Sequence, residues 1–159
     1  MRKDDVLKND DFTSFYQAML NKDITTVKFL VASGANVNAK NHFDDTPLLV
    51  ATQSNQDINM VKILVNGGAN VNARNKHGIT PLRWAVYHQN CEVAKLLVSE
   101  GANINAKDHD GLTPLSLAGE HDELVRILVS NESSHKEIDD ANHKTCIESN
   151  NEEIHKQEI

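Results

Sequence analysis

Histidines are the residues of this 159-residue sequence best suited to chemistry, and the chain has eight of them. An imidazole can bind a metal ion or transfer a proton near neutral pH. His42, His77 and His109 recur along the chain, but His77 is one residue out of step with the other two. A metal site requires several ligands that converge on one point. We therefore expect no metal and no cofactor, and we interpret these histidines as solvated turn residues.

Signals for other kinds of catalysis are absent from the sequence. There is no Gly-rich phosphate loop, no dinucleotide-binding motif, no His-Glu-x-x-His zinc motif and no Gly-x-Ser-x-Gly nucleophile motif. The acidic pairs Asp44–Asp45 and Asp139–Asp140 stand in segments predicted to be exposed, where nothing excludes water as catalytic carboxylates require. We therefore expect no enzymatic activity and no small-molecule substrate.

The composition narrows the possible environments and partners. The first residues lack the apolar stretch of a signal peptide, and no apolar run approaches the roughly 18 residues of a membrane span. Cys91 and Cys146 form no Cys-x-x-Cys motif, so reduced thiols in the cytoplasm are the expected state. A formal net charge of -7 argues against a general nucleic-acid binder. We expect a cytoplasmic protein without membrane insertion.

Three short patterns recur in the same order with a period near 33 residues, which is the signature of a repeat protein. Thr-Pro-Leu occurs at residues 46–48, 80–82 and 113–115. Gly-Ala-Asn, followed by Val-Asn-Ala or Ile-Asn-Ala, occurs at residues 34–39, 68–73 and 101–106. An apolar pattern with one Lys or Arg at its second position occurs at residues 27–31, 61–65, 94–98 and 125–129.

Each pattern predicts a local structure. Thr followed by Pro is typical of a helix start, because the hydroxyl caps a free amide and Pro fits the first helical position. The apolar pattern has helical spacing and predicts a second helix. Gly101 suits the left-handed position after that helix, and residues 108–111 predict a turn. The unit is therefore helix, loop, helix and projecting turn, and a loop near residues 53–56 accommodates the extra residue of the longer unit.

These patterns resemble the ankyrin repeat, whose units begin with Gly-x-Thr-Pro-Leu-His-x-Ala and end with Gly-Ala-Asp-Val-Asn-Ala. Residues 78–85 and 111–118 match the beginning closely. Residues 44–51 match it with Asp44 in place of Gly, since Asp can adopt the left-handed region. The His of the pattern is replaced throughout, by Leu49, Arg83 and Ser116. The hydrogen bond that this His makes between loops is therefore expected to be lost or substituted.

The resemblance covers about residues 10–130 and implies an all-α solenoid, an ankyrin repeat stack of helix-loop-helix-turn units of about 33 residues. About four helix pairs with partial terminal repeats are expected. The repeat domain is expected over residues 1–131, as a partial repeat at 8–40, repeats at 41–74 and 75–107, and a partial repeat at 108–131. Thr13 aligns with the Thr of the Thr-Pro starts, the last helix pair is clipped, and Trp84 and Cys91 take packed positions.

Residues 132–159 have a different composition. They carry eight acidic residues against three lysines, and they contain no aromatic residue, Val or Leu. Their large apolar residues are Ile138, Ile147, Ile154 and Ile159. Such a segment cannot bury enough apolar area to offset the entropy of ordering it. We expect an acidic polar tail that is disordered and lies outside the repeats.

The resemblance also implies where a partner binds, because the family makes its contacts with turn tips and with the exposed ends of the first helices. Transferred residue by residue, these positions are His42, Phe43, Asp44, Gln53, Ser54, Lys76, His77, Tyr87, His88, His109 and Asp110. Two rows of cations are further candidates for contact with an acidic partner: Lys28, Lys62, Lys95 and Arg126 on the second helices, and Lys40, Arg74 and Lys107 at the turns.

Two functions from different classes remain open. The first is a non-enzymatic protein-protein interaction module, a monomer that binds an unknown partner protein through the concave face and turn tips of an ankyrin stack. The alternative is a regulatory or inhibitory protein whose acidic C-terminal tail masks a basic or nucleic-acid-binding surface, with the repeats acting as a docking platform.

Overall fold

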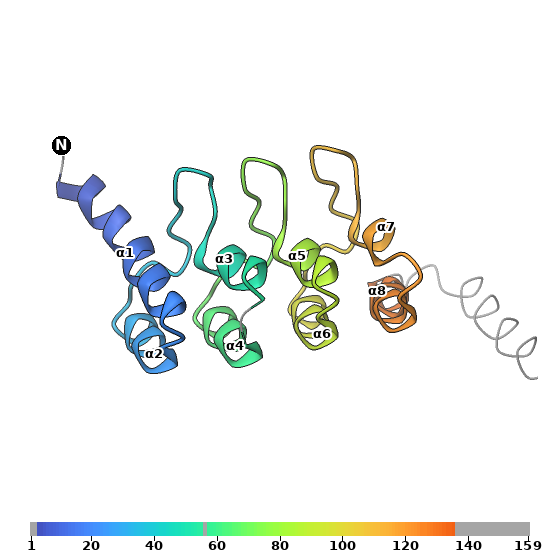
Figure 1. Cartoon of the computed structure of the whole chain (residues 1–159), viewed down its shortest axis with the longest axis horizontal. Helices are drawn as coiled ribbons and strands as arrows, with labels where there is room; N and C mark the ends of the chain where they lie inside the picture. Colours follow the sequence, from blue (N-terminus) through green and yellow to red (C-terminus); the bar gives the residue numbers. More distant parts are fainter. Residues whose placement is uncertain (1–2, 56, 136–159) are drawn as a thin grey trace, which may run out of the picture.

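The computed structural model describes residues 3–55 and 57–135, and these residues fold into helices without a strand. The helices are α1 (Lys3–Leu20), α2 (Ile24–Ala32), α3 (Pro47–Gln53), α4 (Ile58–Asn66), α5 (Pro81–Tyr87), α6 (Cys91–Ser99), α7 (Pro114–Ala118) and α8 (Asp122–His135). In Figure 1 they form a row of helix pairs, and the turns between pairs project from one side of the row. The odd-numbered helices lie nearer to these turns than the even-numbered ones. The predicted all-α solenoid of four helix pairs is confirmed.

The helices begin where capping chemistry predicts them. Each Thr of the Thr-Pro-Leu pattern accepts a hydrogen bond from the backbone N–H three residues later, and the Pro takes the first helical position. These caps are Thr46, Thr80 and Thr113. The second helices of the first three pairs are capped by Asp23, Asp57 and Asn90. Caps of this kind satisfy amides that the first helical turn leaves free, so the local sequence fixes both helix starts of a repeat.

The loop between the two helices of a pair holds the extra residue of the longer unit. Residues 54–57 link α3 to α4, whereas only residues 88–90 link α5 to α6. The helices keep their lengths, since α3 and α5 have seven residues each and α4 and α6 have nine each. The predicted position of the insertion is therefore confirmed.

The first and last units differ from the prediction in their helices. α1 begins at Lys3, so Thr13 lies inside a helix of 18 residues and is not its cap. The residue after Thr13 is Ser rather than Pro, and without the Pro ring the helix continues through this point. α7 has only five residues, but α8 has 14 and runs to His135, past the predicted repeat boundary at residue 131. Only the first helix of the last pair is shortened. The disordered tail was predicted over residues 132–159, but residues 132–135 belong to α8, and the rest of the tail lies outside the described residues.

One hydrophobic core runs through all four helix pairs. Its largest fully buried side chains are mostly aliphatic: Phe15, Met19, Leu48, Met60, Leu64, Leu82, Leu97, Leu124 and Leu128. Each pair packs on the next, since α3 contacts α5, α5 contacts α7 and α6 contacts α8. The layers between neighbouring pairs are thin, so Leu, Val and Ala fill them, which accounts for the aromatic content of only 4%.

Asparagines of the Gly-Ala-Asn-Val-Asn-Ala pattern fasten each repeat to the next. The Asn38 side chain accepts a hydrogen bond from the N–H of Asn70 at 2.7 Å and donates one to the carbonyl of Gly68 at 3.1 Å. Asn72 makes the same two contacts one repeat further on, again at 2.7 and 3.1 Å. Each bridge satisfies backbone groups of a loop that has no helix or strand partner.

Replacing Asn72 with Ala removes both hydrogen bonds of one bridge, and we expect it to lower the free energy of unfolding by about 2 kcal/mol. Asn105 is a matched control, because it holds the same repeat position but its side chain makes no hydrogen bond within residues 3–55 and 57–135. Asn105→Ala should change the stability by less than about 0.5 kcal/mol. Urea unfolding followed by circular dichroism measures both, and equal effects would show that the bridges do not stabilise the stack.

Candidate interaction surface

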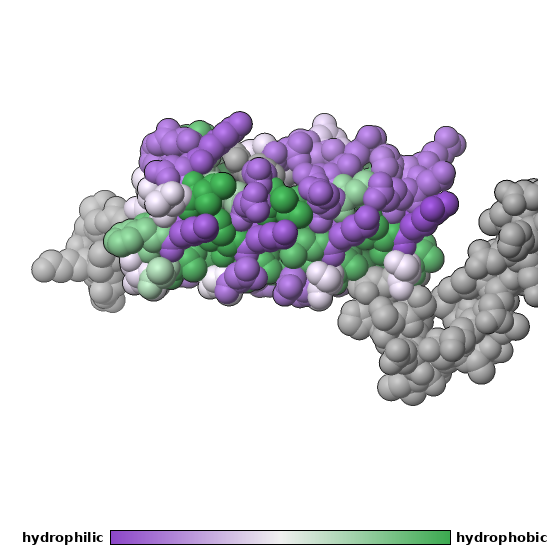
Figure 2. Space-filling model, turned by 90° about the horizontal axis from the view of Figure 1, so that it is seen from below, coloured by the Kyte–Doolittle hydropathy of each residue, from purple (hydrophilic) through white to green (hydrophobic). Residues whose placement is uncertain are grey.

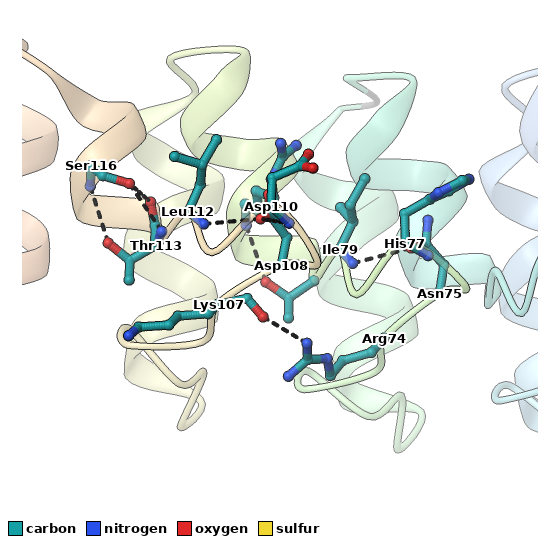
Figure 3. Close-up of polar contacts among 12 residues, drawn as sticks. Arg74, Asn75, His77, Ile79, Lys107, Asp108, Asp110, Leu112, Thr113 and Ser116 are labelled. Carbon is teal, nitrogen blue, oxygen red and sulfur yellow. Dashed lines mark hydrogen bonds and ion pairs between the residues drawn. The ribbon is translucent and has the colours of Figure 1, made fainter.

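One polar side chain closes each projecting turn. Asn41, Asn75 and Asp108 stand at one repeat position, and the Oδ1 of each accepts hydrogen bonds from the N–H groups two and four residues further along, at 2.8 to 3.1 Å. Figure 3 shows two of these closures. Such a side chain holds the residues between in a defined shape. Sequence reasoning missed this position, although the recurrence of Asn, Asn and Asp at spacings of 34 and 33 could have found it.

Successive turns are hydrogen-bonded to one another through their backbones. The N–H of Lys76 donates to the carbonyl of Phe43 at 2.9 Å, and the N–H of His109 donates to the carbonyl of His77 at 3.1 Å. The three turns therefore form a connected unit whose shape does not have to be ordered on binding. We call this unit the turn row: residues 40–45, 74–79 and 107–112.

The tips of the turn row carry most of the predicted contact residues. Those exposed to solvent are His42, Phe43, Lys76, His77, His109 and Asp110. Phe43 is 62% exposed, so its ring is available to a partner. Asp44 is partly buried and has a φ of 60°. The expectation that Asp44 replaces Gly in a left-handed conformation is confirmed.

The remaining predicted contact residues lie where α3 and α5 end. Gln53 and Ser54 are exposed, and the Nε2 of His88 lies 2.7 Å from the carbonyl oxygen of Gln53, which links the two helix ends. Tyr87 is 62% exposed, and its ring meets those of Trp84 and His88 edge-on, with centroid distances of 5.7 and 5.2 Å. The structure thus joins Tyr87 and His88 into one aromatic cluster with a residue that was not predicted to belong to it.

That additional residue, Trp84, corrects one prediction. It is only partly buried and not a core residue, and its ring stacks on that of His88 at a centroid distance of 6.1 Å. Its Nε1 is buried without a hydrogen-bond partner in the part of the chain that the structure describes. The same repeat position holds the much smaller Val50, which is buried. An indole is too large for that layer, so it extends to the surface, where its ring meets that of Tyr87 edge-on.

Leu49, Arg83 and Ser116, which replace the His of the family pattern, act in three different ways. Leu49 is fully buried. The Ser116 hydroxyl accepts a hydrogen bond from the N–H of Thr113 at 2.9 Å and completes a reciprocal cap of α7. The Nε of Arg83 donates to Oδ2 of Asp108 at 2.6 Å. The contact between loops is therefore lost at Leu49, becomes local at Ser116 and is substituted by an ion pair at Arg83.

The ion pair of Arg83 with Asp108 joins α5 to the following turn. The Asp108 side chain is 2% exposed and that of Arg83 is 16% exposed. Burial alone would raise the pKa of the Asp108 carboxyl, but hydrogen bonds from the N–H of Leu112, from Arg83 and from the N–H of Asp110, with the Arg83 charge, hold that pKa below its usual value. Asp108 is therefore a fixed anion that supports the turn row and not a contact residue.

Each of the two rows of cations has a member that is bonded to the next repeat. At the turns, Figure 3 shows Arg74 donating to the carbonyl of Lys107, with Nη2 at 2.6 Å, so this cation fastens two neighbouring turns. On the even-numbered helices, Lys95 donates to Glu123 at 2.9 Å, which raises the pKa of Lys95 and lowers that of Glu123. Figure 2 shows this face as apolar surface crossed by hydrophilic side chains.

The described residues offer no arrangement for metal chemistry. Within residues 3–55 and 57–135, no three His, Cys, Asp or Glu side chains are grouped so that they could hold an ion. Cys91 is partly buried and packs against the core, and burial together with a hydrogen bond to Glu123 raises the pKa of its thiol. A protonated thiol is a weak nucleophile, so Cys91 acts as a packing residue. None of the described helices combines the length and the apolar character that would let it cross a membrane.

Comparison with known proteins agrees with the repeat pattern. A family model described as ankyrin repeats, in three copies, matches residues 15–108. The matched segment includes α2 to α6 and most of the turn row, and it spans more than half of the chain. No curated protein matches the sequence.

Proposed function

The chain belongs to the ankyrin-repeat family, and from this we propose that it binds a partner protein through the tips of the turn row and the ends of α3 and α5. Ankyrin repeats are generally protein-protein interaction modules. We call the eleven predicted contact residues on these elements the binding surface. Recognition is the mechanism that we propose for it, since its side chains are suited to contact with another protein surface.

Two exposed aromatic rings on a rigid backbone support the proposal that this surface binds a partner. Phe43 and Tyr87 are large side chains that lose little conformational entropy when a partner covers them. The backbone of Phe43 is bonded to the next turn through Lys76, and Tyr87 rests on Trp84 and His88. Because these residues are already held in place, binding avoids most of the ordering cost that weakens flexible surfaces.

The charge of the turn row indicates the chemistry of the partner. Its exposed cations outnumber the acids that are not paired with a cation: Lys40, Arg74, Lys76 and Lys107 against Asp44, Asp45 and Asp110. This excess stands against the net charge of -7 of the whole chain. A partner face with acidic side chains around an apolar patch would complement both the cations and the two rings.

The combined substitution of Phe43, His77 and Tyr87 with Ala tests the surface. We expect at least a tenfold weaker affinity, about 1.4 kcal/mol or more, since aromatic anchors carry a large share of binding energy. The partner is first recovered by cross-linking to the full chain, and its affinity for each variant is then measured by calorimetry. All three side chains are exposed, so the circular dichroism spectrum and the unfolding midpoint should stay unchanged.

The matched control is the pair of substitutions Phe29→Ala and Lys62→Ala. It removes a ring that is 69% exposed and a cation from the even-numbered helices, away from the turns. The control variant should bind the partner as tightly as the unaltered chain. Unchanged affinity of the triple variant, or an equal loss in the control, would place the binding site elsewhere.

The alternative function rests on the acidic tail, residues 132–159. The structure describes only residues 132–135 of this segment, as the end of α8. None of the contacts among the described residues favours masking of a basic surface. That function therefore stays a prediction of the sequence.

A further inference from the structure

Asn66 and Gly67, at the end of α4, form the one Asn-Gly pair of the sequence. Asn66 is the last residue of the helix and is exposed to solvent. Gly67 is the cap that follows it, with a φ of -77°, which any residue could adopt. The equivalent caps of α2 and α6 are Ser33 and Glu100. The repeat pattern therefore does not require Gly at this position.

Packing between two repeats explains the Gly. A Cβ atom at position 67 would lie only 2.6 Å from Cγ1 of Val31 in α2 and 3.2 Å from the carbonyl oxygen of Ile63. α2 and α4 lie side by side in the row of helix pairs (Figure 1). The contact with Val31 thus keeps position 67 free of a side chain and places an Asn-Gly pair in the junction between α2 and α4.

An Asn-Gly pair can modify itself, because Gly has no side chain that keeps its backbone nitrogen away from the preceding carboxamide. The nitrogen of Gly67 attacks Cγ of Asn66, the Cγ–Nδ2 bond breaks, and the proton of the Gly67 N–H leaves with Nδ2 as ammonia. Water then opens the cyclic imide at either of its carbonyl carbons, and the nitrogen regains a proton. The product is an aspartate or an isoaspartate, which adds one methylene group to the backbone.

The folded chain blocks the first step of this reaction. The N–H of Gly67 donates to the carbonyl of Ile63 at 3.0 Å, and the next two N–H groups also donate back into α4 at 3.0 Å each. From the preceding repeat, the Asn38 side chain binds the carbonyl of Gly68 and the N–H of Asn70. The segment after Asn66 is therefore held on both sides, and the attack requires that the junction between α2 and α4 opens.

We propose that Asn66 is a site of self-modification that is protected while α2 and α4 are packed together and reacts when their junction opens. The isoaspartate product hinders closure of the junction. Its additional methylene group displaces the N–H groups that end α4, and Val31 leaves no room for Gly67 to move toward α2. The new carboxylate also lies at the negative end of the helix dipole. Opening of this junction is thereby converted into a lasting loss of stability.

Incubation of the full chain at mildly alkaline pH, with and without guanidinium chloride, measures the protection. Trypsin cleaves after Lys62 and Arg74, so one peptide contains Asn66 together with Asn70 and Asn72. Tandem mass spectrometry of this peptide locates the deamidated residue. We expect deamidation of Asn66 to be at least about tenfold slower in the folded chain than in denaturant, because the reaction needs a local opening. Asn70 and Asn72 precede Val and Ala, whose side chains hinder the attack, and they should stay unmodified.

Matched substitutions locate the opening. Asn38→Ala removes the two hydrogen bonds to Gly68 and Asn70, and it should increase the deamidation rate of Asn66 roughly tenfold in the folded chain. Asn72→Ala removes the two equivalent bonds at the next junction and should increase this rate much less. Both variants keep the Asn-Gly pair, so in denaturant both should react as fast as the unaltered chain.

The stability of the deamidated chain tests the consequence. Ion exchange separates this chain from the unreacted one through its additional negative charge. Asn66→Asp is the matched control, because it has the same charge on a normal backbone. We expect the deamidated chain to unfold at a lower urea concentration than Asn66→Asp, and Asn66→Asp to unfold at a slightly lower concentration than the unaltered chain.

Three results would overturn the inference. Asn66 could react as fast in the folded chain as in denaturant, which would show that the end of α4 is not protected. Asn38→Ala could accelerate the reaction no more than Asn72→Ala, which would assign the opening to unfolding of the whole stack. The deamidated chain could be as stable as Asn66→Asp, which would show that the junction closes again. None of these outcomes depends on the proposed binding surface, because none of its residues takes part.

Discussion

Replacing Arg83 with Leu is expected to lower the free energy of unfolding by about 3 kcal/mol, the usual cost of removing one partner from a buried ion pair. The carboxylate of Asp108 would stay buried, held only by the N–H groups of Asp110 and Leu112. An anion without its counter-ion is poorly solvated inside the protein. Urea unfolding at neutral pH, followed by circular dichroism, measures the change.

Most of this loss should disappear when Asp108→Asn is added to Arg83→Leu. One repeat earlier, the same two positions hold Leu49 and Asn75, and that turn is closed without an ion pair. The double variant therefore reproduces a junction that the chain already contains. We expect it to lie within about 1 kcal/mol of the unaltered chain, a strongly non-additive result. Additive losses would mean that the ion pair is not the source of the cost.

The pH dependence of stability gives a second readout of the same pair. The pKa of Asp108 is held below its usual value in the folded chain. The contribution of Asp108 to the free energy of unfolding is therefore complete above the pKa of an unfolded carboxyl, about 3.9. It is lost as the pH falls through the lower pKa that Asp108 has in the folded chain. Asp108→Asn cannot be protonated in this way, so the stability difference between Asp108→Asn and the unaltered chain should shrink as the pH falls from about 5 to about 3.

Replacing Leu82 with Ala is expected to cost about 3 kcal/mol, whereas Leu115→Ala should cost about 1 kcal/mol or less. Both residues follow a Thr-Pro helix start, so the two variants change helix propensity equally. Leu82 is fully buried, and its truncation leaves a cavity between packed helix pairs. Leu115 is 38% exposed, so less apolar area is lost there and water or neighbouring chain replaces the side chain.

Thermal unfolding of both variants measures this difference as a larger decrease in Tm for Leu82→Ala. Equal decreases in Tm would show that the end of the stack is packed as completely as its middle.

Helix starts could be predicted from the sequence because capping is local. Thr46, Thr80 and Thr113 each bond to an amide three residues away, so the pattern and the contact lie in the same short segment. The loop insertion between α3 and α4 and the left-handed Asp44 were predictable for the same reason. The start of α1 was not, since no strong cap or breaker marks it.

Contacts between repeats could not be predicted in this way. Asp11 accepts a hydrogen bond from the N–H of Asn36, a contact that the side chain of an asparagine makes at the later junctions. Arg83 pairs with Asp108 over the same separation of 25 residues. Neither separation equals the repeat length, so the periodic pattern does not show which side chains meet.

For the candidate binding surface as well, some features could be predicted from the sequence and others depend on contacts between repeats. The family resemblance located the turn tips, but only the folded chain shows that Trp84 belongs with Tyr87 and His88 and that Arg74 is bonded to a neighbouring turn. These roles depend on the size of the space beside each side chain and on which carbonyl lies within reach. A single sequence shows neither the size of that space nor which carbonyl is near.

Leu82 and Leu115 show that the sequence pattern of a repeat does not determine how deeply a residue is buried. The same residue in the same Thr-Pro-Leu pattern lies in the first turn of both helices, and the sequence alone predicted the repeats and the Thr-Pro helix starts. Stacking then buried one Leu fully and left the other 38% exposed in the last repeat. Capping and helix propensity act within a few residues, whereas burial depends on which neighbours a repeat has.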